Sequence, residues 1–333
     1  MALSSPQILF FSTLLLGTML SVSSTSWFGA WVGLELNLLS FIPIISSKNN
    51  QYSSEAALKY FLIQALGSSV IILSASFMLT ATGPASLLLA TSLLLKSGAA
   101  PFHFWFPSVM EGLQWPQAIL LMTIQKIAPM SLLSYLTLNH VFPVFWAAIM
   151  LSALVGAVGG LNQTLLRKIM AYSSINHMAW MMSAILISET SWLVYFTIYC
   201  IISSSIALLF FYQEAFHVSH LLNHTNHSSP LKLLTFMSLL SLGGLPPFTG
   251  FIPKWILIQE LISSGLFLIL AILLMSALIT LFYYLRISLT AMTISTPKTK
   301  WNSKSKGLSY LAPSILSLNV LGLLVPSILM LAV

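Results

Sequence analysis

The sequence contains few charged residues and no aspartate. Of its 333 residues only 6% are charged and 57% are hydrophobic, and all six acidic residues are glutamates. A soluble domain carries about 25% charged residues, so the chain lacks the composition of a water-soluble surface. The single cysteine, Cys200, excludes an internal disulfide and an iron–sulfur cluster held by four thiolates.

Targeting signals and redox motifs are also missing. The first basic residue is Lys48, whereas a signal peptide begins with positive charge and a transit peptide is rich in arginine. We therefore expect insertion from the compartment in which the protein is made, as for an organelle-encoded or bacterial inner-membrane protein. No Gly-x-Gly-x-x-Gly loop and no Cys-x-x-Cys-His segment occurs. The basic residues are too scattered to favour a nucleic-acid partner.

Long, continuous apolar runs fill the sequence instead. A helix that crosses a bilayer needs about 20 apolar residues, and continuous rather than alternating runs exclude an outer-membrane barrel. We predict an all-α polytopic membrane protein with a single transmembrane domain, residues 1–333, and about eleven transmembrane helices. The predicted spans are 7–24, 25–46, 54–80, 84–110, 114–139, 141–160, 165–187, 190–216, 231–263, 265–290 and 309–331.

The basic residues predict the orientation. They follow the second, sixth, eighth and tenth predicted spans, and the loops after the first, third, fifth, seventh and ninth spans contain no lysine or arginine. Because basic residues mark the inner side, we expect the N-terminus inside, which is the matrix in a mitochondrion, and the C-terminus in the intermembrane space. The basic residues concerned are Lys48, Arg167, Lys168, Lys232, Lys298, Lys300, Lys304 and Lys306.

Four ionisable residues lie inside apolar stretches, where a charge costs roughly 2.5–3.5 kcal/mol. Groups that can exist in either protonation state suit a proton relay. A static ion pair between the glutamate and one lysine is the structural alternative, but it leaves two lysines unexplained. The four residues are Glu35, Lys96, Lys126 and Lys254.

Other polar residues have ordinary explanations. Glu55 and Lys59 are spaced i,i+4 near a helix start and predict an interfacial ion pair. His103 and His177 are candidate accessory relay positions, although hydrogen bonding between helices explains each about as well. The four histidines within 217–227 have no carboxylate close by, so we expect a solvated connector and no metal site.

Glycine and proline interrupt two of the spans next to lysines. Lys96 lies in LKSGAAPFHFW (95–105) and Lys254 in GGLPPFTGFIPKW (243–255). Such interruptions free backbone carbonyls, which a nearby lysine at a half-helix C-terminus can stabilise. The interrupted spans are the fourth and ninth. This spacing of five predicts inverted-topology repeats, 7–139 and 141–290, followed by an extra helix at 309–331.

Several segments resemble the subunit 2 family of mitochondrial NADH:ubiquinone oxidoreductase, respiratory complex I, in its animal form. The Lys-Ser-Gly-Ala-x-Pro-Phe-His segment together with Gly-Gly-Leu-Pro-Pro is specific, and the segments occur in the order of the family. They are GLELNLLSF (33–41), LLKSGAAPFHFW (94–105), GGLNQT (159–164), SSINH (173–177) and SLGGLPP (241–247).

The resemblance implies an antiporter-like subunit of the membrane arm that takes part in proton translocation. It implies a coupled pair of Glu35 and Lys96, a central relay at Lys126 and a second-half position at Lys254. The enzyme activity would be that of the whole proton-translocating NADH:ubiquinone reductase. NADH, FMN, iron–sulfur clusters and ubiquinone would be bound by other subunits, with no cofactor or metal in this chain. Partners would be the other membrane-arm subunits, including neighbouring antiporter-like ones, and phospholipids.

Two alternatives to a redox-driven pump subunit stay open. A stand-alone cation/proton antiporter would use the same lysines, although the absence of an aspartate pair for Na⁺ disfavours it. A structural spacer that conducts no protons would also present long apolar faces to its neighbours.

Overall fold

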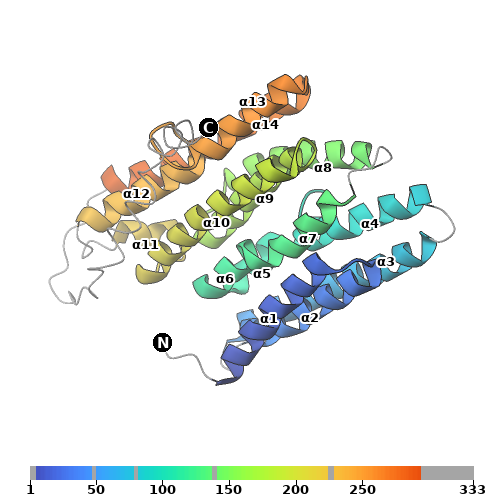
Figure 1. Cartoon of the computed structure of the whole chain (residues 1–333). Coiled ribbons are helices and arrows are strands. Elements are labelled where there is room, and N and C mark those ends of the chain that lie inside the picture. Colours follow the sequence, from blue (N-terminus) through green and yellow to red (C-terminus); the bar gives the residue numbers. More distant parts are fainter. Residues whose placement is uncertain (1–4, 47–49, 79–81, 137–140, 224–228, 294–333) are drawn as a thin grey trace, which may run out of the picture. The chain divides into compact units, whose positions relative to one another are not determined.

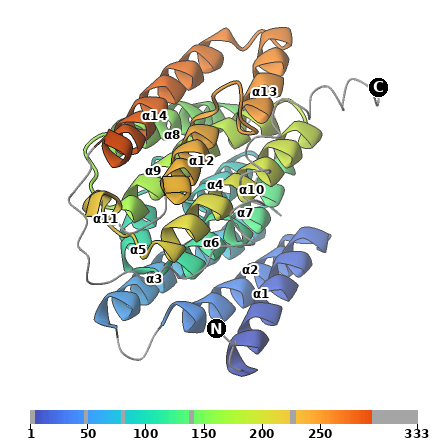
Figure 2. The same ribbon diagram turned by 90° about the vertical axis from the view of Figure 1, so that its left-hand side faces the viewer.

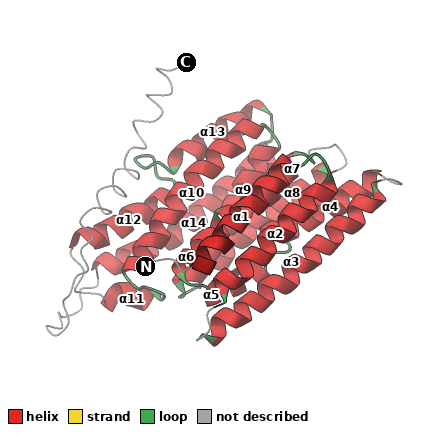
Figure 3. Ribbon diagram, turned by 60° about the horizontal axis from the view of Figure 1, so that its bottom comes forward, coloured by secondary structure: helices red, strands yellow, loops and turns green. Residues whose placement is uncertain are grey.

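The chain folds into helices joined by short loops. The computed structural model describes residues 5–46, 50–78, 82–136, 141–223 and 229–293. These described ranges contain no β-strand (Figure 3), and one isolated bridge pairs Leu165 with His217. The predicted mostly helical architecture is therefore confirmed. The predicted span 309–331 lies outside the described residues, as do Lys48, His224, His227 and the basic residues from 298 to 306.

The chain divides into two compact units, residues 1–155 and 156–333, with the division inside α8 (Phe142–Gly160). The helices of the first unit that precede α8 are α1 (Ser5–Ser23), α2 (Trp27–Ile45), α3 (Gln51–Phe77), α4 (Thr82–Ser97), α5 (Trp105–Gly112), α6 (Trp115–Met122) and α7 (Ile124–Ser134). Those of the second unit that follow it are α9 (Leu166–Ile185), α10 (Glu189–Tyr212), α11 (Val218–Asn223), α12 (Ser229–Gly243), α13 (Phe251–Ser263) and α14 (Phe267–Thr293).

In the first unit α1, α2 and α3 lie side by side (Figure 1). Glycines allow α1 and α2 to approach closely. A Cβ atom added at Gly33 would lie 2.5 Å from the backbone nitrogen of Ser21, and one added at Gly17 would lie 2.9 Å from that of Asn37. Small residues at such crossings are typical of membrane helices. This close contact holds the half of α2 that carries Glu35 and Asn37.

In the second unit α12 packs between α10 and α14 (Figure 2). Nearly every residue of α9 is buried, and α9 packs against α10, α13 and α14. An apolar helix buried on all sides is the core element of a bundle. The polar residues of α9 therefore face protein.

Among the described helices, six are long and apolar enough to cross a membrane: α1, α2, α3, α8, α10 and α14. Their exposed surfaces carry large apolar side chains such as Leu16, Leu62 and Leu278, which are 60%, 60% and 64% exposed. An apolar outer face suits a lipid environment. The structure thus has the helical, apolar character predicted from the sequence.

Both predicted interruptions are non-helical segments, at 98–104 and 244–250. A third break was not predicted. The span expected at 114–139 is divided at Thr123, whose backbone angles (φ −113°, ψ −81°) are not helical. The Thr123 hydroxyl donates a hydrogen bond to the carbonyl of Ile119 (2.7 Å). Threonine side chains compete with helical backbone bonding in this way.

Candidate functional site

The end of α4 places Lys96 inside the first unit. Gly98 has a positive φ of 75°, and the Ala99 amide donates to the carbonyl of Leu94 (3.1 Å). A left-handed glycine followed by this bond is the usual way to end a helix. Lys96 lies in the last turn of α4 and is 5% exposed. The helix thus stops just after the lysine, as the glycine and proline of the sequence predicted.

Residues of α3 and α5 hold the Lys96 turn in place. Gln64 donates to the backbone carbonyl of Lys96 (3.2 Å), and the indole of Trp105 donates to the carbonyl of Leu95 (3.0 Å). Gly67 leaves room for the lysine, because an added Cβ would lie 2.9 Å from Lys96 Cγ. Carbonyls freed at the helix end therefore have specific partners, as buried backbone groups require.

The break at Thr123 precedes Lys126, which is 2% exposed on α7. Its Nζ lies 5.0 Å from the centre of the Phe106 ring, within the range of a cation–π contact. Pro129 follows three residues later inside α7. Because proline has no N–H, it cannot donate to the carbonyl four residues earlier. The turn with Lys126 thus lies between two interruptions of helical bonding.

Lys96 and Lys126 line one cavity of the first unit. The volume open to the centre of a water molecule is about 20 Å³, and about 10–15 Å³ is enough for one water. Polar groups from α2, α3 and α7 share the lining. The lining residues are Leu34, Asn37, Leu38, Tyr60, Gln64, Lys96, Ser97, Trp105, Phe106, Leu121, Gln125, Lys126 and Pro129. A polar cavity of this size can hold a water between two lysines.

Glu35 and His103 do not line this cavity. Glu35 interacts electrostatically with Lys96, but in the described part of the chain these two side chains form no ion pair within 4 Å. The Oε2 atom of Glu35 is buried and has no hydrogen-bond partner. His103 lies in the non-helical segment, 7% exposed, with Nδ1 3.2 Å from the carbonyl of Pro101. The coupled pair of Glu35 and Lys96 stays a prediction.

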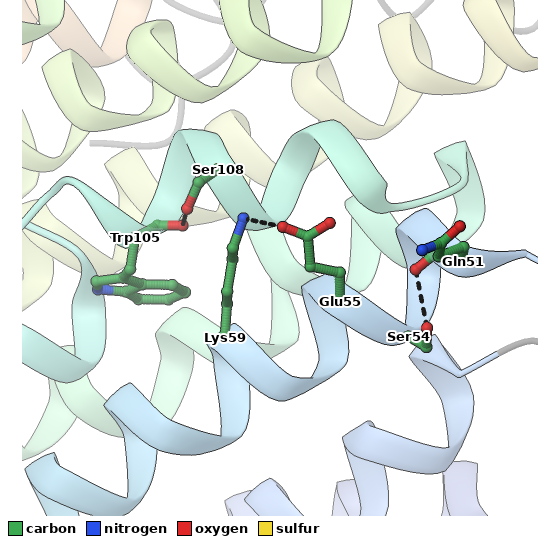
Figure 4. A network of polar contacts seen from close by, with 6 residues as sticks. All are labelled: Gln51, Ser54, Glu55, Lys59, Trp105 and Ser108. Carbon is green, nitrogen blue, oxygen red and sulfur yellow. Dashed lines mark hydrogen bonds and ion pairs between the residues drawn. The ribbon is translucent and has the colours of Figure 1, made fainter.

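The ion pair predicted for Glu55 and Lys59 is present on α3. Lys59 Nζ lies 2.6 Å from Glu55 Oε1, and the two residues are drawn in Figure 4. The Glu55 side chain is 56% exposed and the Lys59 side chain 46%. Exposed pairs of this kind contribute at most about 1 kcal/mol. The pair is therefore a surface feature, distinct from the buried lysines.

In the second unit, Lys254 bridges the break between α12 and α13. It is 6% exposed, and its Nζ donates to the carbonyl of Gly243, the last residue of α12 (2.9 Å). The ring of Trp180 lies 5.8 Å from the same atom. Gly244 has a positive φ of 78°, and a Cβ there would lie 2.9 Å from Lys254 Cδ. The predicted contact between a lysine and the C-terminal carbonyls of a half-helix is thus present at Lys254.

His177 on α9 forms a hydrogen bond with α10 near this break. Its Nδ1 lies 2.8 Å from the hydroxyl of Tyr195 on α10, and the ring of Tyr199 lies 5.0 Å from its ring. His177, Tyr195 and Tyr199 line a cavity with Gly250 and with residues of α12 and α13. The volume open to water centres there is about 10 Å³. The Tyr195 hydroxyl therefore contributes to the orientation of this imidazole.

No group of three or more His, Cys, Asp or Glu side chains in the described ranges could hold a metal ion. The His217 and His220 rings lie 5.5 Å apart. Because the other two histidines of that segment lie outside the described residues, its interpretation as a solvated connector stays a prediction.

Comparison with known proteins identifies the family. Residues 24–280 match the model of the NADH:quinone oxidoreductase/Mrp antiporter transmembrane family. This chain belongs to that family. It is 47% identical to NADH-ubiquinone oxidoreductase chain 2 of Anopheles gambiae, over 89% of each chain. It is 46% identical to the chain 2 of Aedes aegypti, over 95% of this chain and 96% of that protein.

Two solved structures share the fold of this chain. A chain in the structure of respiratory complex I from Thermus thermophilus superposes with a TM-score of 0.85 at 24% identity, covering 97% of this chain and 78% of that one. A chain of the Mrp complex from a Dietzia species gives 0.76 at 17% identity, covering 88% of this chain and 61% of that one. The antiporter-like membrane fold of the family is therefore present here.

The structure also brings residues to the first-unit cavity that sequence reasoning did not single out. They are Asn37, Tyr60, Gln64 and Gln125, neutral polar groups on three different helices. Tyr195, the partner of His177, was missed as well. One signal was available, because Tyr60 and Gln64 are spaced i,i+4 within an apolar span and so share a helix face.

Proposed function

We propose that this chain is a proton-translocating membrane-arm subunit of NADH:ubiquinone oxidoreductase in the mitochondrial inner membrane. The placement of Lys96 and Lys126, both about 95% buried or more, on one water-sized polar cavity supports the proposal most directly. Relatives at 46–47% identity over nearly their whole length carry the name of that enzyme's chain 2. The match extends over 89% and 96% of the lengths of those two relatives, so we propose the same role for this chain.

The proposed role is proton transfer without electron transfer. NADH, FMN, iron–sulfur clusters and ubiquinone would be bound by other subunits of the complex, and neighbouring antiporter-like subunits would be partners. We further propose eleven transmembrane helices in inverted repeats, 7–139 and 141–290, within one transmembrane domain, with the N-terminus in the matrix. In this arrangement Lys254 occupies in the second repeat the place that Lys96 has in the first.

Charge interactions are large enough to drive such transfer. Moving one charge against 100 mV needs about 2.3 kcal/mol. A unit-charge pair at 4 Å in an effective dielectric of 20 is worth about 4 kcal/mol. A change in the distance between Glu35 and Lys96, which interact electrostatically without an ion pair, would therefore alter proton affinity at Lys96 by enough to move a proton.

The route we propose runs from Lys96 across the shared cavity to Lys126 and on toward Lys254. A water in the cavity would accept a proton from one lysine and donate one to the other. His103 and His177 are proposed accessory positions, since a neutral imidazole has one donor and one acceptor nitrogen. In the second half, the bond from Lys254 Nζ to the Gly243 carbonyl would hold the amine at the helix break.

Substitution of Lys126 tests the proposal. The Lys126→Met variant keeps most of the length of the side chain and removes its proton-carrying group. In sealed vesicles that contain the intact complex, we expect fewer protons moved per NADH. Lys59→Met is the matched control, because Lys59 is exposed and lies on the surface pair. Unchanged stoichiometry in an assembled Lys126→Met complex would contradict the relay.

A further inference from the structure

The amide of Gln125 connects three helices beside Lys126. Its Nε2 donates to Asn37 Oδ1 on α2 (2.8 Å), and its Oε1 accepts from the hydroxyl of Tyr60 on α3 (3.1 Å). The amide group therefore satisfies a donor and an acceptor on two neighbouring helices at once. Asn37 and Tyr60 are each 2% exposed, so these bonds lie away from the outer surface.

The backbone around Gln125 has little helical support of its own. The break at Thr123 ends the hydrogen-bond ladder just before this turn, and Pro129 cannot donate to the carbonyl of Gln125. A turn flanked by two such interruptions can rotate more easily than the interior of a regular helix. The side-chain bonds of Gln125 thus tie this turn to α2 and α3 and contribute to the direction of the adjacent Lys126.

The face of α3 that carries Tyr60 also contacts the turn of α4 that carries Lys96. Tyr60 packs against Trp105 with ring centres 5.9 Å apart, and Trp105 donates to the carbonyl of Leu95. Gln64, one turn after Tyr60, donates to the carbonyl of Lys96 itself. Contacts from one helix face therefore extend to both lysine-bearing turns.

We propose that Gln125 is a positioning residue that, through Tyr60 and Asn37, fixes the Lys126 turn at a set distance from Lys96 across the shared cavity. The inference rests on the proposed function, because it assigns how two relay lysines are held in register. An amide is neither an acid nor a base in the physiological range. Gln125 thus positions the relay and does not carry the proton.

Three variants test the proposal in the intact complex in sealed vesicles. Gln125→Leu removes both bonds at similar volume, and Tyr60→Phe removes one bond while keeping the ring. We expect Gln125→Leu to lower NADH-driven proton transport roughly two- to tenfold, the range for loss of a neutral hydrogen bond. Tyr60→Phe should lower it less. The two changes together should match Gln125→Leu alone, since both act through the same amide.

Gln117→Leu is the matched control. Gln117 also binds across helices, because its Nε2 donates to the carbonyl of Ile44 (2.7 Å), but it does not line the cavity. We expect this variant to keep the wild-type rate of NADH-driven proton transport. A fall as large as that of Gln125→Leu would mean that any loss of interhelical bonding has this effect, and would overturn the proposal.

Combination with Lys126→Met separates this proposal from the proposed function. If Lys126→Met lowers NADH-driven proton transport, Gln125→Leu should cause no further fall in transport in the Lys126→Met background. If Lys126→Met has its effect and Gln125→Leu and Tyr60→Phe have none, the positioning role is wrong and the relay stands. If Lys126→Met itself has no effect, the relay is wrong. Should Gln125→Leu fail to assemble, Tyr60→Phe decides: wild-type transport overturns the proposal and reduced transport upholds it.

Discussion

Gly67 on α3 allows the position of Lys96 to be changed without altering any ionisable group. An added Cβ at Gly67 would lie 2.9 Å from Lys96 Cγ and 3.2 Å from Lys96 Cε. Ordinary van der Waals contact begins at about 3.4 Å, so Gly67→Ala should displace the lysine side chain by about half an ångström. The amine stays intact but moves within the cavity.

The expected effect on transport follows from geometry. A misplacement of about 1 Å in a reacting geometry can cost 100-fold in rate. A shift of about half that size therefore predicts a fall of up to about tenfold in NADH-driven proton transport. Alanine in place of a helical glycine also favours the helix by roughly 0.5–1 kcal/mol. Overpacking costs about 1–3 kcal/mol, so assembly should be close to normal.

Gly83→Ala controls for the helix effect. Gly83 lies in α4, and nothing lies within 4 Å of an added Cβ. Both variants are assayed as initial rates of vesicle acidification on addition of NADH, normalised to assembled complex. The account expects reduced transport for Gly67→Ala and a wild-type rate for Gly83→Ala. Equal wild-type rates for both would refute the argument that the Lys96 side chain has to occupy its observed position.

Two further predictions concern the second unit. Lys254→Met removes the donor to the Gly243 carbonyl and should lower protons per NADH measurably in sealed vesicles. Lys254→Arg keeps donors but cannot lose its proton, so it should lower protons per NADH as well; a wild-type value for Lys254→Arg would show that a charged donor at the break is sufficient and that Lys254 carries no proton. Tyr195→Phe removes the hydroxyl that lies 2.8 Å from His177 Nδ1 and should lower the rate of NADH-driven proton transport roughly two- to tenfold, with the Tyr212→Phe variant unaffected. A wild-type rate for Tyr195→Phe would show that transport does not depend on this contact of His177.

The breaks near Lys96 and Lys254 could be predicted because glycine and proline act on their own local backbone. Gly98 and Gly244 both adopt positive φ, which glycine does without the steric cost that other residues meet. The break at Thr123 could not be predicted in this way. The Thr123 hydroxyl bonds the carbonyl of Ile119 at the break, but the Ser152 hydroxyl makes the same bond to the carbonyl of Ala148 inside the continuous helix α8, so residue type does not mark the position of the break.

The residues that line the cavity were harder to predict from the sequence than the buried lysines. A buried charge is conspicuous in an apolar run, whereas Asn37 and Gln125 become informative only when two helices place them 2.8 Å apart. Such register between distant segments depends on packing. Glu35 illustrates the same limit, since the sequence identified the residue but not that it lies without an ion pair to Lys96.

The most direct test of the central claim is Lys96→Met in the intact complex. The NADH oxidation rate and the protons moved per NADH are measured together in sealed vesicles, against wild type. If Lys96 belongs to the coupling machinery, the assembled variant will show a lower rate or a lower stoichiometry. If both values equal those of wild type, this buried lysine is structural and the chain is a spacer between the subunits that conduct protons.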